Sequence, residues 1–469
     1  MAIVCKNCFC RKVLTCQTGK KSNFWRFSEV LRRCSSTLPF SSDRDPAQSE
    51  GLPIHKYIDK THKRVNMLFA CGLTATGALG LREKSSRTQS RRYPIRLTNI
   101  GKLKITSVGC GYGYTVFASN NRDLIKVWGS GINTQSQLGF HSSQKGVTKG
   151  RPAESGHFDY VMETTAIPIP FDSFSKTKVT QVSCGRAHTL LLTDNEGIFS
   201  FGCNSFGQCG REIIQGEIYE GSRKIHCIPH IHFSSPVTQI SCGMDHSLFL
   251  TKSGEVYGCG WGADGQTGLG SYEKTGIPKL LKGDLEGVKV KQISTFADMS
   301  MAVCEDGHLY GWGNSEYYQL ASVTDDTQVC TPIRLPFKNI GKIVSAAAGG
   351  SICCALNEEG EVFVWGYGIL GKGPDLKDSR HPEKIPQTLF GESTFSPSVK
   401  VTKIKCGMNH FAAVTNNGEL FTWGKNKSGC LGIGEYRDQY FPWKVLVPGE
   451  VVDVFCGVDH TVILSKSML

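Results

Sequence analysis

The stretch VTQVSCGRAHTLLLTDNEGIFSFGCNSFGQCG, residues 179–210, contains the pattern that decides the fold. Residues 179–183 alternate apolar and polar side chains, residues 189–193 are nearly all apolar, and residues 198–201 form a third apolar run. Alternation is typical of a half-buried strand, and a short apolar run is typical of a strand buried on both faces. Because Gly197 supplies the positive φ of a tight hairpin, the stretch predicts three short strands joined by turns.

The same unit recurs along the whole chain. Its two markers are a Cys-Gly pair, degenerate in two copies, and an aromatic residue or Cys followed by Gly. Each marker occurs seven times, and successive copies of the second lie 53 to 73 residues apart. A propeller blade takes about 40 to 50 residues, to which loop insertions add. The pattern therefore predicts an all-β, seven-bladed propeller. The first marker stands at Cys110-Gly111, Cys184-Gly185, Cys242-Gly243, Thr295-Phe296, Ala348-Gly349, Cys406-Gly407 and Cys456-Gly457, and the second at Cys71-Gly72, Trp128-Gly129, Phe201-Gly202, Cys259-Gly260, Trp312-Gly313, Trp365-Gly366 and Trp423-Gly424.

The two ends of the repeat region are complementary half-units. Residues 67–72 have the pattern of a third strand without the first two, and residues 451–465 have that of a first and second strand without a third. Pairing the two halves in one blade closes the ring and removes two exposed sheet edges, so we expect this closure. Fourth strands are expected at the outer edges, where proline is tolerated. They cover residues 93–97, 278–281, 332–335 and 442–447.

Length and composition agree with one large hydrophobic core. The chain has 469 residues, of which 39% are hydrophobic, and no apolar run is long enough to span a membrane. Most of its twenty cysteines stand singly within apolar strands, where cysteine acts as a small buried hydrophobe. A chain of this length needs no disulfide staples, so we expect a reducing compartment.

The first 42 residues differ from the rest. They hold eight Lys or Arg against the single acid Glu29, and Phe24, Phe27 and Leu31 fall on one face of a potential helix. This composition is typical of a mitochondrial transit peptide, and the alternative is a disordered basic tail. The organisation that we predict is a transit peptide at residues 1–42, a linker at 43–64 and the propeller at 65–469. More than half of the formal net charge of +12 lies in the first segment, so the propeller is only mildly basic.

A second basic segment covers residues 82–104, where eight Lys or Arg are opposed by Glu83 alone. Cations interleaved with Ser, Thr and Tyr93 are suited to contact the phosphates of RNA, and the alternative is a solvated charged loop. The candidates for RNA contact are Arg82, Lys84, Arg87, Arg91, Arg92 and Arg96.

Polar side chains follow each Cys-Gly marker, at a position that is expected to converge on one face of the ring. One interpretation is that they contact a protein partner, and the other is that His and Asp bond neighbouring backbone and lock the entry of each strand. No Ser-His-Asp order, carboxylate pair or metal-ligand spacing accompanies them, so we expect no bond-making chemistry, no cofactor and no metal ion. The contact candidates are Arg186, His188, Asp245, His246, His410, Asp459 and His460.

These paired elements resemble the regulator of chromosome condensation family of seven-bladed propellers. An example is CGMDHSLFLTKSGEVYGCG at residues 242–260, and the resemblance covers residues 65–469. Four stretches are similar to the mitochondrial branch of that family. They are CGWGADGQTGLG (259–270), WGNSEYYQLASVTDDTQV (312–329), VFVWGYGILGKGP (362–374) and DQYFPWKV (438–445).

The resemblance implies a function without bond chemistry. The founding member of the family is a guanine-nucleotide exchange factor, and Asp245 and His460 match an acid and a histidine that matter for its exchange activity. Arg186 stands where that member has an acid, and residues 349–352 lack the histidine. The mitochondrial branch implies exchange on a dynamin-like fusion GTPase and a part in maturation of the large mitochondrial ribosomal RNA. The resemblance also implies the matrix or the matrix face of the inner membrane as location, with peripheral membrane association. The alternative function is an assembly scaffold that binds RNA and proteins without exchange activity.

Overall fold

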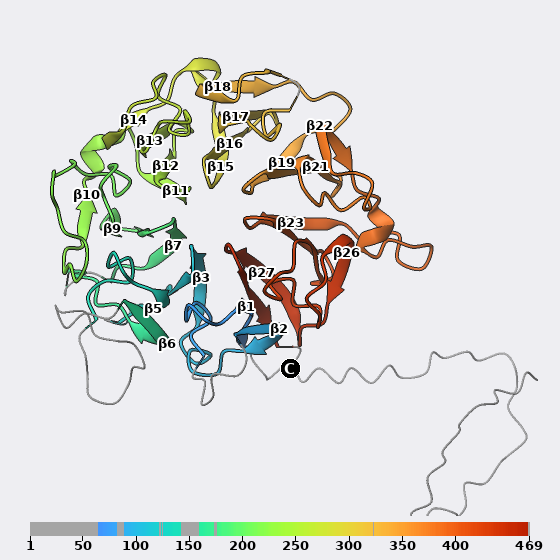
Figure 1. Ribbon diagram of the computed structural model, residues 1–469, viewed down its shortest axis with the longest axis horizontal. Coiled ribbons are helices and arrows are strands. Elements are labelled where there is room, and N and C mark those ends of the chain that lie inside the picture. Colours follow the sequence, from blue (N-terminus) through green and yellow to red (C-terminus); the bar gives the residue numbers. More distant parts are fainter. Residues whose placement is uncertain are drawn as a thin grey trace, which may run out of the picture. The chain divides into compact units, whose positions relative to one another are not determined.

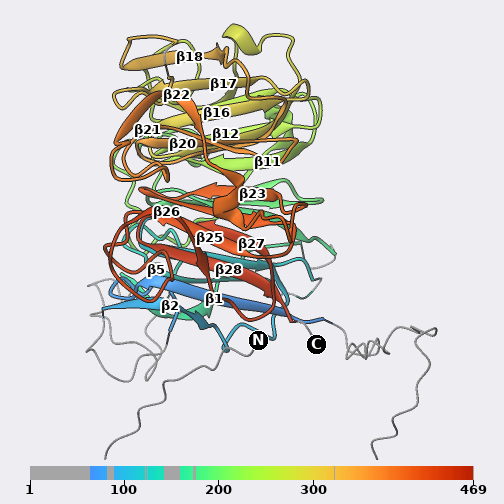
Figure 2. The ribbon, with the colours of Figure 1, turned by 90° about the vertical axis from the view of Figure 1, so that its right-hand side faces the viewer.

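The computed structural model describes residues 64–81, 89–121, 123, 125–141, 159–172, 176–321 and 323–467. Within these residues the strands form seven four-stranded antiparallel sheets, which stand as blades around a central axis (Figure 1). The prediction of an all-β, seven-bladed propeller is confirmed. Viewed edge-on, the strands run from one face of the ring to the other, so the connections between them lie on the two faces (Figure 2). None of the helical segments in the described ranges is long and apolar enough to cross a membrane.

The blades are numbered here in chain order from the first complete one, and their strands are given from the inner to the outer. Blade 1 is β3 (Ile105–Cys110), β4 (Tyr114–Ser119), β5 (Val127–Ile132) and β6 (Tyr160–Ala166), and blade 2 is β7 (Val179–Cys184), β8 (His188–Thr193), β9 (Ile198–Gly202) and β10 (His226–Ile228). Blade 3 is β11 (Val237–Cys242), β12 (His246–Thr251), β13 (Val256–Gly260) and β14 (Thr275–Leu280), and blade 4 is β15 (Val290–Phe296), β16 (Met299–Cys304), β17 (Leu309–Asn314) and β18 (Gln328–Leu335). Blade 5 is β19 (Ile343–Ala348), β20 (Ile352–Asn357), β21 (Val362–Tyr367) and β22 (Asp378–Lys384), and blade 6 is β23 (Val401–Cys406), β24 (His410–Thr415), β25 (Leu420–Gly424) and β26 (Gln439–Val445). Blade 7 is β27 (Glu450–Cys456), β28 (His460–Lys466), β1 (Asn66–Leu73) and β2 (Ser90–Arg96), and the short helices are η1 (His230–His232), η2 (Gly283–Leu285) and η3 (Gln387–Phe390).

Blade 7 joins the two ends of the repeat region. Its strand order is β2-β1-β28-β27, and β1 pairs with β28 in a register that places Phe69 opposite Ile463. The expected closure by two half-blades is therefore confirmed. The outer strands begin earlier than we predicted, because pairing continues beyond a bulge. In blade 7, for example, pairing shifts between Ala70 and Gly72 and then places Gly72 opposite Arg91.

The hydrophobic core lies between the blades. The second strand of each blade is buried on both faces, as β8 shows with all six of its residues buried. Seven clusters of buried side chains occur in the described residues, and each combines two neighbouring blades, as Val116 of blade 1 does with Leu191 of blade 2. Because each cluster needs side chains from two blades, one sheet buries too little apolar surface on its own. The closed ring is therefore the cooperative unit.

Candidate protein-binding face

One face of the ring carries the turns between the first and second strands, and we call it the turn face. Five of the seven turns, those of blades 1, 2, 3, 5 and 6, hydrogen-bond sideways to the turn of the next blade. The Arg186 amide donates to the Met244 carbonyl at 2.9 Å, and the Met244 amide donates to the Ala297 carbonyl at 2.7 Å. The connections between third and fourth strands lie on the same face, since the Cys203 amide donates to the Ala187 carbonyl at 2.8 Å. The turn face is thus a fixed frame. Its turns are residues 111–113, 185–187, 243–245, 297–298, 349–351, 407–409 and 457–459.

In four of the five Cys-Gly markers, the glycine makes room for the histidine three residues later. A Cβ built on Gly185 would lie 2.2 Å from Cε1 of His188, and one on Gly243 would lie 2.0 Å from Cε1 of His246. A second glycine faces each histidine across the strand pair, as Gly202 faces His188 at a φ of +99°. The histidine rings therefore fold back over backbone that has no side chain, and this explains the spacing Cys-Gly-x-x-His.

The four histidines join neighbouring blades. Each ring is at most 1% exposed, and its Nε2 lies within hydrogen-bonding distance of a hydroxyl on the second strand of the next blade. The structure thus places these four contact candidates beneath the turn face, where they lock the entry of a strand, as the alternative interpretation has it. Their partner is a side-chain hydroxyl and not the backbone group that was expected. Direct contact with a protein stays a prediction that their burial does not favour. The pairs are His188 with Ser247 (3.0 Å), His246 with Ser300 (2.9 Å), His410 with Thr461 (3.0 Å) and His460 with Thr115 (2.9 Å).

Other side chains fill the same position in the remaining blades. In blade 1, the Tyr114 hydroxyl donates to the His188 carbonyl at 2.5 Å. Blades 4 and 5 have Met299 and Ile352, which are buried and make only apolar contacts there. Burial lowers the pKa of His188 and His246 to about 3 and that of His410 and His460 to about 4. The imidazoles are therefore neutral near pH 7, as an uncharged interface requires.

Arg186 and Asp245 form an ion pair across blades 2 and 3 on the turn face. Nη2 of Arg186 lies 2.6 Å from Oδ2 of Asp245, and its Nε donates to Oδ1 at 3.2 Å. The arginine side chain is 49% exposed and the aspartate side chain 7%. Burial raises the pKa of Asp245, and the arginine opposes that rise. The guanidinium therefore remains available to a partner while it holds the carboxylate in place.

Asp298 is an acid of the turn face that the sequence analysis missed. Burial raises its pKa to about 6; the hydrogen bond from Gln266 (2.9 Å) lowers that pKa, and nearby Asp264 and Asp245 raise it. Its signal was present in the sequence, because aligning the degenerate copy TFADM (295–299) with CGMDH (242–246) places Asp298 at the position of Asp245. The missing Cys and His concealed the correspondence.

The remaining acid among the candidates, Asp459, lies in the turn of blade 7. Its side chain is half-buried, which raises its pKa, and Lys427 of blade 6 opposes the rise. Asp245, Asp298 and Asp459 thus stand at equivalent positions of blades 3, 4 and 7. Acids at these fixed positions can attract a cationic side chain of a docked protein.

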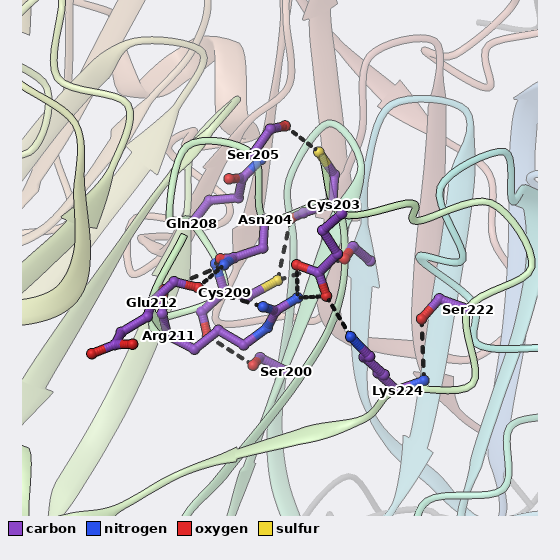
Figure 3. Close-up of polar contacts among 12 residues, drawn as sticks. Ser200, Cys203, Asn204, Ser205, Gln208, Cys209, Arg211, Glu212, Ser222 and Lys224 are labelled. Atoms are coloured by element: carbon purple, nitrogen blue, oxygen red, sulfur yellow. Dashed lines mark hydrogen bonds and ion pairs between the residues drawn. The ribbon is translucent and has the colours of Figure 1, made fainter. Parts of the chain in front are cut away.

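The connection between β9 and β10 lies on the turn face at blade 2, and polar contacts within it are drawn in Figure 3. The Asn204 side chain accepts from the Cys209 amide at 2.9 Å and donates to the Glu212 carbonyl at 3.0 Å. Glu217 receives hydrogen bonds from Arg211 at 2.8 Å and from Lys224 at 3.1 Å. Burial by itself raises the pKa of Glu217, but these two cations outweigh it and lower the pKa. The connection is therefore held by its own polar contacts.

The candidates for RNA contact fall into two groups. Arg82, Lys84 and Arg87 lie outside the described residues. Arg91, Arg92 and Arg96 lie on the outer strand β2, where Arg92 and Arg96 are exposed. The Arg92 guanidinium stands 5.7 Å from the ring of Tyr93, which is 59% exposed. Across the ranges that the structure describes, no group of three or more His, Cys, Asp or Glu side chains is arranged to hold a metal ion.

Family models match most of the propeller. The model described as the RCC1-like domain matches residues 63–340, and the model of the regulator of chromosome condensation (RCC1) repeat matches residues 359–414 and 417–464. The yeast RCC1 (Prp20) structure, at 21% identity and a TM-score of 0.70 over 89% of this chain and 96% of that chain, shares the fold.

Two mammalian relatives match at much higher identity. The RCC1-like G exchanging factor-like protein of Mus musculus is 51% identical over 91% of this chain and 94% of its own, and that of Homo sapiens is 52% identical over 89% and 90%. The crystal structure of human WBSCR16 superposes with a TM-score of 0.80 at 52% identity, over 87% of this chain and all of that chain. The chain therefore belongs to the regulator of chromosome condensation family of propeller proteins.

Proposed function

We propose that this chain promotes guanine-nucleotide exchange on a mitochondrial GTPase that docks on the turn face. The observation that carries the proposal is the Arg186–Asp245 pair, which stands on a rigid frame next to the half-buried Asp298. Support comes from two relatives that share about half of their residues with this chain and are named as similar to a G exchanging factor. The resemblance to the mitochondrial branch suggests a dynamin-like fusion GTPase as the partner.

Exchange of this kind needs affinity, and it breaks no bond. An exchange factor binds the nucleotide-free GTPase more tightly than the loaded form, so by linkage it weakens nucleotide binding by the same factor. A carboxylate at the position of Asp245 or Asp298 attracts a lysine that otherwise holds phosphate. The rigid frame favours this role because little conformational entropy is lost when a partner binds to it.

The test is the release of fluorescent GDP from the purified dynamin-like GTPase, followed by stopped flow with and without the chain. We expect acceleration that Asp245→Asn and Asp459→Asn each reduce by about tenfold or more, since each removes a charge from a charge-assisted contact. Asp306→Asn serves as the matched control, because Asp306 lies in the turn between β16 and β17 on the opposite face. Absence of acceleration by the unmodified chain would remove the exchange function.

A location in the mitochondrial matrix or on the matrix face of the inner membrane belongs to the same proposal. It rests on the basic, acid-poor first 42 residues. Import into isolated mitochondria tests it, with protease protection and carbonate extraction of the imported chain. We expect a protected chain that carbonate releases, as a peripheral association requires. A chain that remains accessible to protease outside the organelle would contradict the proposal.

A second candidate function is an assembly scaffold that contacts large-subunit mitochondrial ribosomal RNA and its assembly proteins. Exposed Arg92, Arg96 and Tyr93 on β2 favour it, and the Ser90 hydroxyl holds the 46% exposed Tyr436 nearby at 2.9 Å. Cations interleaved with exposed rings suit single-stranded RNA, because phosphates pair with the cations and bases stack on the rings. Ultraviolet crosslinking in organello is the test. RNA recovery that is unchanged in the Arg92→Glu, Arg96→Glu double variant would count against this function.

A further inference from the structure

A depression of about 610 Å³ lies on the turn face over blades 3 to 6. Its size is in the range of sites that bind a small ligand or an anchoring side chain. Asp298 and Tyr317 of blade 4, Tyr367, Pro374 and Leu376 of blade 5, and Met408 of blade 6 are among the residues that line it. Acidic, aromatic and aliphatic groups therefore meet in one hollow, although they come from three blades.

Two tyrosines present ring surface to this depression. The rings of Tyr317 and Tyr367 have centroids 5.8 Å apart and an interplanar angle of 33°. They are 40% and 50% exposed, whereas the tryptophans of the neighbouring strands are fully buried. Tyr367 ends β21, and Tyr317 lies in the turn that follows β17, so the two rings come from different blades. Exposed aromatic rings on a rigid support are typical of recognition sites.

Backbone in the depression and in the neighbouring turn is held in conformations that ordinary side chains seldom adopt. Tyr318 and Ala321 have φ angles of 64° and 59°, at positions where blade 2 has Gly207 and Gly210. Ala297, which also lines the depression, has a φ of 47°. Such strain at non-glycine residues concentrates at sites that bind ligands.

The strained turn is nevertheless well anchored. The amide of Tyr317 donates to Oε1 of Gln319 at 2.8 Å, and the Arg380 guanidinium lies 4.3 Å from the ring centroid of Tyr318. The amide of Asn314 donates to the Asp298 carbonyl at 2.9 Å. This hydrogen bond joins the turn that contains Asp298 to the end of β17, which precedes Tyr317.

The charges around the depression select the kind of side chain that it receives. Asp298 faces Asp264, Asp245 and Tyr112, with Arg186 as the cation near it. Asp438, Lys377 and Lys425 also line the depression. A cation at Asp298 would offset the mutual repulsion of the three acids, whereas an anion there would add to it. Guanidinium is the cation that both stacks on aromatic rings and bonds a carboxylate through two N–H groups.

We propose that this depression binds an arginine side chain of a protein partner. The guanidinium stacks on Tyr317 or Tyr367 and donates to Asp298, and an apolar neighbour in the partner's segment packs on Pro374 and Leu376. The inference rests on the proposed function in taking a protein as occupant of the turn face. Its test uses a peptide and no GTPase, so the two proposals can fail separately.

The experiment is a titration of the full chain, labelled with ¹³C at the methionine methyl groups, followed by NMR. Met244 and Met408 line the depression and report on occupancy, while Met301 is buried between blades 4 and 5 and serves as internal reference. The probe is the capped tripeptide acetyl-Leu-Arg-Pro-amide. Its matched control has citrulline in place of arginine, which keeps the shape and removes the charge.

We expect saturable shifts of the Met244 or Met408 methyl with the arginine peptide, and binding of the citrulline peptide that is weaker by about tenfold, as loss of a charge-assisted bond implies. Asp298→Asn and Tyr317→Ala should each weaken the arginine peptide to a similar degree, whereas Tyr317→Phe keeps the ring and retains binding. Glu286→Gln, an exposed acid after η2 on the opposite face, should have no effect. Binding should also weaken as the pH falls below about 6, where Asp298 takes up a proton.

Two results would overturn the proposal in the unmodified protein, where loss of folding in a variant plays no part. One is equal binding of the arginine and citrulline peptides, or no saturable shift with either. The other is displacement of the arginine peptide by hexauridylate with larger shifts at the same methyls, which would make the depression an RNA surface.

Discussion

Nε2 of His460 lies 2.9 Å from Oγ1 of Thr115, although 345 residues separate the two in the chain. This contact joins blade 7, in which the two ends of the repeat region pair, to blade 1. It repeats the bond that His188 makes to Ser247 between two consecutive blades, at 3.0 Å. The junction between blade 7, which contains both chain ends, and blade 1 is therefore held by the same kind of side-chain contact as the junction between blades 2 and 3.

Replacement of His460 tests how much that contact stabilises the ring. His460→Ala leaves a cavity and an unpaired Thr115 hydroxyl, so we expect a loss of about 2 to 4 kcal/mol in the free energy of unfolding. His460→Met fills the space as Met299 does in blade 4 and should cost only about 1 to 1.5 kcal/mol. Urea unfolding midpoints measure both. Equal losses in the two variants would show that the hydroxyl contact, and not the packing, dominates.

The buried histidines should make stability fall in mild acid. Burial lowers the pKa of His188, His246, His410 and His460 from 6.5 to about 3 or 4, so the unfolded chain takes up protons first. Stability is complete above pH 6.5 and is lost towards pH 4, by up to about 1.4 kcal/mol per histidine for each pH unit. Asp245, Asp298 and Asp459, whose pKa values burial raises, act in the opposite direction but are fewer than the histidines.

Urea midpoints between pH 7.5 and 5 measure this dependence, with His410→Met as the comparison. Removal of one of the four histidines should reduce the slope of the unfolding free energy against pH by about the contribution of one histidine. A variant curve that is parallel to the unmodified one would contradict the neutral, buried state of His410.

Glycines that face the histidines should tolerate no side chain. A Cβ on Gly260 would lie 2.5 Å from the Asp245 carbonyl oxygen and 2.6 Å from Cα of His246, and the φ of Gly260 is +111°. We expect Gly260→Ala to cost about 3 kcal/mol or more, since both overlap and backbone strain oppose it. Gly216, with a φ of +77° and nothing within 4 Å of the added carbon, is the matched control.

Gly216→Ala should cost only the conformational part, about 1 kcal/mol. Soluble yield and the thermal midpoint distinguish the two substitutions. Similar losses at both positions would mean that the close approach of the strands does not matter at Gly260.

Thiol reactivity should follow burial. In the part of the chain that the structure describes, Cys227 on β10 is the exposed cysteine, while Cys353 and Cys354 on β20 are buried between blades. Maleimide should label Cys227 in the native protein and the other two only after unfolding. Because burial raises the pKa of Cys227, labelling should accelerate about tenfold per pH unit near neutrality. Peptide mass mapping reads the sites, and native labelling of Cys353 would contradict the packing of blade 5.

The number of blades and the closure by half-blades were readable from the chain itself, as were four of the seven outer strands apart from their first residues. They depend on features within a few residues of each other, such as the apolar run 189–193 and the glycines beside it. Backbone freedom at glycine and burial of an apolar run are local preferences, so a repeated pattern is enough to reveal them.

The contact partners of the histidines and acids that recur in the repeats became visible only in the tertiary structure. His188 meets a hydroxyl 59 residues away, and Asp298 joins the turn face although its repeat lacks both the Cys and the His. The depression beside Tyr317 and Tyr367 is built from four blades. Such contacts depend on how closely neighbouring sheets pack and on where their turns lie. No short segment of the chain carries that information, because the two residues of each contact belong to different repeats.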